Sequence, residues 1–68
     1  MKHTFHERFS EIINQSELTY EEIATKLGLK SKGTISKYAS GQIQNIGPVM
    51  IDKIATLFDV SPIWLLGY

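Results

Sequence analysis

Residues 28–41, GLKSKGTISKYASG, concentrate side chains that can bind an anion. The stretch holds three lysines, three serines and a threonine but no acid, and its larger apolar residues are only Leu29, Ile35 and Tyr38. Ammonium groups attract negatively charged oxygens, and hydroxyl groups can donate hydrogen bonds to the same partners. The simpler alternative is a surface helix whose lysines only keep its outer face in water.

The charges are sorted along the chain, although the formal net charge is zero. Residues 1–22 have a balance of minus three, residues 23–51 contain four lysines and no acid, and residues 52–68 have a balance of minus one. A local excess of positive charge can attract a polyanion even when the net charge is zero. The middle of the chain is therefore the candidate binding segment.

The length and the composition exclude several classes of protein. The 68 residues form one domain, residues 1–68, and a domain of this size buries only about 60% of its unfolded surface, so a large enclosed active site is not expected. The chain has no cysteine for a disulfide, a thiolate zinc site or a nucleophile. No stretch approaches the roughly 20 apolar residues of a membrane span. We expect a soluble cytoplasmic protein with no membrane partner.

Apolar spacing and capping residues predict five helices. Phe5, Phe9, Ile12 and Ile13 recur at helical spacing. Pro48 and Pro62 each follow a residue that can cap a helix. No run alternates long enough to predict a strand. The expected helices cover about 4–15, 20–27, 32–39, 48–58 and 62–66.

The second and third helices have the clearest ends. Thr19 and Glu22 stand in the T-x-x-E relation of a capping box, which places the start of the second helix at Tyr20. Gly28 can end this helix in a left-handed conformation. Ser31 can cap the third helix, and Gly41 can close it.

Two short helices joined by a glycine-containing turn, with Ala24 in the first and Ile35 in the second, are typical of a helix-turn-helix. Together with LTYEEIATKLG, TISKYASG and the terminal WLLGY, this pattern makes residues 5–68 similar to the lambda-repressor and Cro-like family of DNA-binding domains. The resemblance implies an all-α, compact five-helix fold with the helix-turn-helix in helices two and three, and no cofactor.

The resemblance also implies a set of site residues, because the third helix of such domains enters the major groove of DNA. With Ile35 as the packed anchor, the residues expected to read base edges are Lys32, Gly33, Thr34, Ser36 and Lys37. The residues expected to contact phosphates are Tyr20, Lys30, Ser31, Ser40, Gln42 and Asn45. The last helix is expected to mediate self-association through Ile63, Leu66 and Tyr68.

The turn before the third helix has an unusual length, and two residues leave alternatives open. GLKSKG places one residue more between Gly28 and Ile35 than the commonest family spacing, so the turn is expected to be longer. Gly33 can lie in that turn if the third helix starts at Thr34, or it can lie in the helix and let the backbone approach DNA. Tyr20 stands where the family often has glutamine, so its hydroxyl can meet a phosphate or its ring can pack against the third helix.

The expected function is sequence-specific binding of double-stranded DNA by a phage or prophage repressor, with a homodimer occluding a promoter at a palindromic operator. The alternative is a helical protein-interaction module, antirepressor-like or antitoxin-like, that binds its partner through the apolar carboxy-terminal end. His3 and His6 share a helical face, but no third ligand supports a metal site. Nothing resembles a nucleophile turn or a glycine-rich phosphate loop, so we expect no catalytic residue and no small-molecule ligand.

Overall fold

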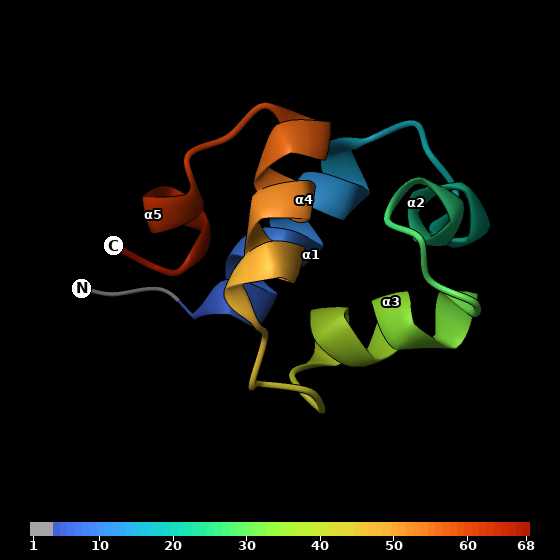
Figure 1. Ribbon diagram of the computed structural model, residues 1–68, viewed down its shortest axis with the longest axis horizontal. Helices are drawn as coiled ribbons and strands as arrows, with labels where there is room; N and C mark the ends of the chain where they lie inside the picture. Colours follow the sequence, from blue (N-terminus) through green and yellow to red (C-terminus); the bar gives the residue numbers. More distant parts are fainter. Residues whose placement is uncertain (1–3) are drawn as a thin grey trace.

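The computed structural model describes residues 4–68 and consists mainly of five helices (Figure 1). They are α1 (Phe5–Gln15), α2 (Tyr20–Lys26), α3 (Lys32–Ser40), α4 (Pro48–Phe58) and α5 (Pro62–Leu65). No strand occurs in residues 4–68. The prediction of an all-α, five-helix domain is therefore confirmed.

Several helix ends differ from the predicted bounds by one residue. Thr4 is the N-cap of α1, and Leu27 and Leu66 are the C-caps of α2 and α5, so these three residues flank the helices. The third helix runs one residue further than expected, to Ser40, because Gly41 takes the left-handed conformation only after it. The bounds of α4 are as predicted.

Capping boxes start the first two helices. The Thr19 hydroxyl oxygen accepts a hydrogen bond from the Glu22 amide at 3.1 Å, and the Glu22 carboxylate accepts one from the Thr19 amide at 3.0 Å. The hydrogen bonds that the Glu22 carboxylate accepts from Thr19, chiefly from its backbone amide and then from its side chain, lower the pKa of Glu22 below its usual value of 4.5, with a smaller contribution from the charge of Lys26. Thr4 and Glu7 form the same box at the start of α1.

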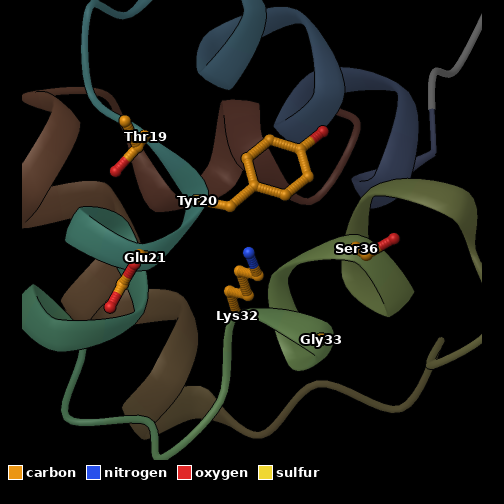
Figure 2. A pocket seen from close by; sticks show the side chains of 6 residues that line it. All are labelled: Thr19, Tyr20, Glu21, Lys32, Gly33 and Ser36. Carbon is orange, nitrogen blue, oxygen red and sulfur yellow. The ribbon is translucent and has the colours of Figure 1, made fainter.

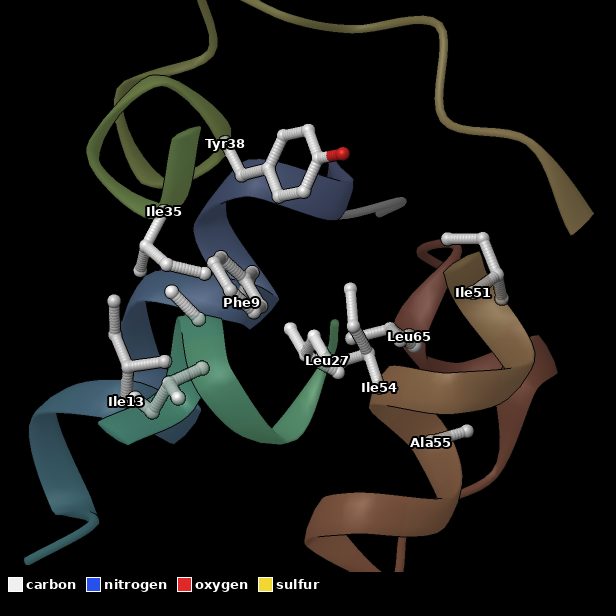
Figure 3. Close-up of a cluster of buried hydrophobic side chains, with 11 residues drawn as sticks. Phe9, Ile13, Leu27, Ile35, Tyr38, Ile51, Ile54, Ala55 and Leu65 are labelled. Atoms are coloured by element: carbon white, nitrogen blue, oxygen red, sulfur yellow. The ribbon is translucent and has the colours of Figure 1, made fainter. Parts of the chain in front are cut away.

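The core is a single cluster of apolar side chains contributed by all five helices (Figure 3). Its largest fully buried members are Phe9, Ile23, Leu27, Ile35, Ile54 and Leu65. An aromatic group joins α1 to α3: the rings of Phe5 and Phe9 stack at 5.3 Å, and Tyr38 meets them edge-on at 6.2 and 6.1 Å. Aromatic pairs prefer particular ring geometries in addition to burying apolar area. These contacts therefore help to set the orientation of α3 relative to α1.

The domain measures 32 × 24 × 22 Å, and its two ends carry different helices. The α5 helix lies at one end of the longest axis, and α2 lies at the other, with α3 along the lower side in Figure 1. The α3 helix packs against α1 and α2, and α5 packs against α1 and α4. Between residues 4 and 68, no helix combines the length and the apolar character needed to cross a membrane.

Candidate nucleic-acid interface

The start of α3 is set by Ser31. Its hydroxyl oxygen accepts a hydrogen bond from the Gly33 amide at 3.1 Å, so the helix begins at Lys32 and Gly33 lies in its first turn. The alternative that the helix starts at Thr34 is therefore wrong. Ile35 is then the fourth residue of the helix and is completely buried.

The additional residue lies in the turn before α3. Gly28 adopts a left-handed φ of 76°, and the Leu29 amide then donates to the Ala24 carbonyl oxygen at 2.8 Å. Leu29 is half-buried, whereas Lys30 is exposed. The turn therefore exposes Lys30, while Ile35 of α3 stays buried.

The two sides of α3 have opposite characters. Ile35 and Tyr38 are buried against the rest of the domain. Of the residues predicted to read base edges, four are exposed and Thr34 is half-buried; the exposed ones are Lys32, Gly33, Ser36 and Lys37. Neither lysine is paired with an acid of residues 4–68, so both charges are available to an external anion.

The α1 helix holds the carboxy-terminal end of α3 through two contacts. The Ser10 hydroxyl donates to the carbonyl oxygen of Ala39 at 2.9 Å, across 29 positions of sequence. The His6 ring lies against Gly41, where an added Cβ would meet His6 Nδ1 at 3.1 Å and Cγ at 3.2 Å. Neither contact leaves a sequence signal, because both join residues far apart in the chain.

A notch of about 550 Å³ separates the beginnings of α2 and α3 (Figure 2). It is lined by Thr19, Tyr20, Glu21, Lys32, Gly33 and Ser36. The ring of Tyr20 extends over the notch, the ammonium group of Lys32 points toward that ring, and the carboxylate of Glu21 points away from both. Thr19 and Glu21 were absent from the predicted site, although both adjoin Tyr20 in the sequence.

The predicted phosphate-contacting residues lie in three places. Tyr20 is in the notch, and Lys30 and Ser31 precede α3. The hydroxyl of Ser40, the last residue of α3, donates to the Lys37 carbonyl oxygen at 3.3 Å and must leave it to reach a phosphate. Gln42 and Asn45 are exposed in the segment between α3 and α4. Three of the six therefore lie at or before the start of α3, and the other three lie at its end or in the segment that follows it.

These features, a buried anchor and an acid-free outer face on the second of two crossed helices, are those of a DNA-reading helix pair. A family model described as helix-turn-helix, of the type that includes lambda repressor and Cro, matches residues 10–65. The chain belongs to the lambda-repressor and Cro-like helix-turn-helix family. No curated protein and no solved structure matches the chain. The family consists of DNA-binding regulators, so this protein is a helix-turn-helix DNA-binding regulator.

The helix-turn-helix domain has an exposed apolar patch at and after α5, and one more exposed apolar residue on α4. The predicted self-association residues Ile63, Leu66 and Tyr68 are 65%, 46% and 68% exposed, and Val49 is 69% exposed. A shallow groove of about 350 Å³ adjoins the patch and is lined by Ile46, Pro48, Ile51, Asp52, Pro62 and Leu66. Leu65 is completely buried and Trp64 half-buried, as expected of residues that complete the core.

Arg8 links α1 to α5 of the helix-turn-helix domain. Its guanidinium carbon lies 4.4 Å from the centre of the Trp64 ring, a cation–π arrangement. One terminal nitrogen, Nη1, is buried without a hydrogen-bond partner. Contact with the Trp64 ring therefore holds the Arg8 guanidinium on a side where Nη1 makes no hydrogen bond.

Of the two histidines considered for a metal site, His3 lies outside the described residues. His6 Nδ1 is 3.1 Å from the Thr4 hydroxyl oxygen. Residues 4–68 contain no group of three or more potential metal ligands.

Proposed function

We propose that this regulator binds a specific DNA sequence by placing α3 in the major groove. The observation that carries the proposal is the two-sided character of α3: Ile35 and Tyr38 hold it to the scaffold, while its exposed side has lysines and small residues and no acid. A major groove about 12 Å wide admits one α-helix, and side chains on its outer face then reach base edges.

The proposed roles follow the chemistry of each side chain. Lys32 and Lys37 can donate to guanine O6 and N7, Ser36 and Thr34 can bond to several bases, and Gly33 lets the backbone come close. Phosphate contacts from both ends of α3 would fix its register, since such contacts position a domain without reading sequence. The residues proposed for them are Tyr20, Lys30, Ser31, Ser40, Gln42 and Asn45.

Self-association through α5 would give the operator its symmetry. Two helix-turn-helix domains of a dimer bind half-sites about 34 Å apart, one turn of DNA, and therefore a palindrome. The exposed Ile63, Leu66 and Tyr68 are the proposed contact.

The proposed regulatory outcome is repression by occlusion. A dimer on an operator that overlaps a promoter would block RNA polymerase. The five-helix pattern ending in WLLGY supports a repressor of a temperate phage or prophage, because this ending resembles theirs.

The deciding experiment is selection from a pool of random duplexes, followed by titration of the selected site across salt concentrations. We expect log K to fall linearly with log salt at a slope of about −0.9 per phosphate contact. Lys32→Ala and Lys37→Ala should weaken specific binding, whereas Lys53→Ala on α4 is the matched control. Selection of no sequence, or loss of binding only in Lys53→Ala, would overturn the proposal.

The alternative function, a protein-interaction module, is favoured by the apolar side chains exposed at the carboxy-terminal end. Ile63, Leu66 and Tyr68 are 65%, 46% and 68% exposed within six residues of sequence, and exposed apolar residues that gather in a patch can mark a protein-binding surface. This function predicts that Ile63→Ser abolishes partner binding while Lys37→Ala leaves it unchanged. The DNA-binding function predicts instead that Lys37→Ala weakens binding to a single DNA half-site, whereas Ile63→Ser leaves that binding unchanged.

A further inference from the structure

The backbone conformation of Gly33 does not require glycine. Its φ is not in the left-handed region, unlike that of Gly28, Gly41 and Gly67. A Cβ at this position would meet a single atom within 4 Å, the Ser31 hydroxyl oxygen at 3.2 Å. Glycine is also less favourable than alanine inside a helix. The missing side chain therefore spares the N-cap hydroxyl a tight contact, and it also leaves the exposed start of α3 without a Cβ.

The missing side chain leaves space in the notch between α2 and α3. One wall of this space is the Tyr20 ring, which is 38% exposed, and another is the bare backbone of Gly33. The ammonium group of Lys32 points toward the same space, whereas the carboxylate of Glu21 points away (Figure 2). The notch thus offers an apolar wall and a cationic hydrogen-bond donor side by side.

Only one natural base matches both features at its major-groove edge. Thymine presents the O4 acceptor next to a C5-methyl group. Cytosine presents an amino donor that would face the Lys32 ammonium group, and the purines present no methyl group. An ammonium group has three donors and no acceptor, so it cannot pair with the cytosine amine.

We propose that the notch is a thymine-reading subsite, in which Lys32 donates to O4 and the methyl group enters the space above Gly33 against the Tyr20 ring. This inference rests on the proposed sequence-specific binding and names one base of the operator. It also assigns Tyr20 a reading role through its ring, while its hydroxyl remains free to reach the backbone.

The test replaces each thymine of the selected operator half-site by uracil, which removes only the methyl group. One position should weaken binding about fourfold, the equivalent of about 0.8 kcal/mol for one buried methyl-sized group. The other thymines of the same duplex are internal controls. Gly33→Ala should place a methyl group in the space above position 33 and weaken binding to the thymine duplex by at least as much.

Combining Gly33→Ala in the protein with uracil in the DNA distinguishes a thymine subsite from a general structural effect of the substitution. In Gly33→Ala, the uracil duplex should bind as well as the thymine duplex, because the methyl group no longer has a place. Gly47→Ala, which adds a Cβ with no atom within 4 Å, should retain the fourfold discrimination.

Two results would overturn the thymine subsite while leaving specific binding intact. One is an affinity that uracil changes at no position. The other is a combined loss of affinity equal to the product of the separate losses from uracil and from Gly33→Ala. Selection of no specific duplex would instead remove the proposed function together with the subsite.

Discussion

Replacing Gly41 by alanine should destabilise the domain through two separable effects. Gly41 ends α3 with a φ of 85°, a conformation that L residues rarely adopt. A Cβ would also meet three atoms of the His6 ring at 3.1, 3.2 and 3.3 Å. These contacts are tighter than ordinary van der Waals packing, so either the ring or the end of α3 must move.

The size of each effect can be worked from these observations. A left-handed conformation is less favourable for alanine than for glycine by about 1–2 kcal/mol. Overpacking in a site that cannot yield adds about 1 kcal/mol or more. We expect Gly41→Ala to lower the free energy of unfolding by about 2–3 kcal/mol, which corresponds to more than 8 °C in Tm for a domain of this size.

A double-mutant cycle with His6→Ala isolates the contact with the ring. In the His6→Ala background, the Gly41→Ala penalty should fall to the backbone part, about 1–2 kcal/mol. Urea unfolding followed by far-UV circular dichroism measures all four proteins. An equal Gly41→Ala penalty in both backgrounds would show that His6 does not restrain the end of α3, and no penalty at all would refute the left-handed cap.

Three further predictions concern single side chains. Glu21→Gln should raise affinity for any duplex about twofold at low salt, the effect of removing one charge about 10 Å from a phosphate in water; a gain that persists at high salt would contradict an electrostatic origin. Ser10→Ala should lower the free energy of unfolding by about 1 kcal/mol, because the Ala39 carbonyl oxygen loses its donor at 2.9 Å; calorimetry checks this, and an unchanged Tm would show that the bond contributes nothing. Because the folded-state pKa of Glu22 is lowered, its stabilising effect is complete above the usual value of 4.5 and is lost as pH falls through the lower folded value. In Glu22→Gln, the free energy of unfolding should therefore decrease less steeply in acid than in the wild type. Urea unfolding measures both pH profiles, and parallel profiles would show that Glu22 does not contribute to the acid sensitivity.

Most of the fold could be predicted because local signals set it. The Thr19–Glu22 capping box, Pro48 and Pro62 each place a helix start within a few residues of sequence, and all three starts are confirmed. The errors are single residues at helix ends, where a cap and a terminal helical residue have similar sequence preferences.

The site could be predicted less completely, because part of it depends on contacts between distant residues. The start of α3 was left open by Gly33 and was decided by the Ser31 hydroxyl, whose geometry no spacing rule supplies. The hold of Ser10 and His6 on the end of α3 joins segments about 30 residues apart, with no pattern in the sequence.

The folded arrangement also limits how strongly charge alone can hold this regulator on DNA. Of the four lysines in the acid-free middle of the chain, Lys26 lies in a different hollow, beside Asp52 and Lys53. Three lysines therefore remain at or beside α3: Lys30, Lys32 and Lys37. Even if each neutralised one phosphate, instead of the base contacts proposed for Lys32 and Lys37, the slope of log K against log salt would be only about −2.7 per domain. Affinity for non-specific DNA should then be weak. A useful affinity for the operator must therefore come largely from base contacts, such as those proposed for the notch.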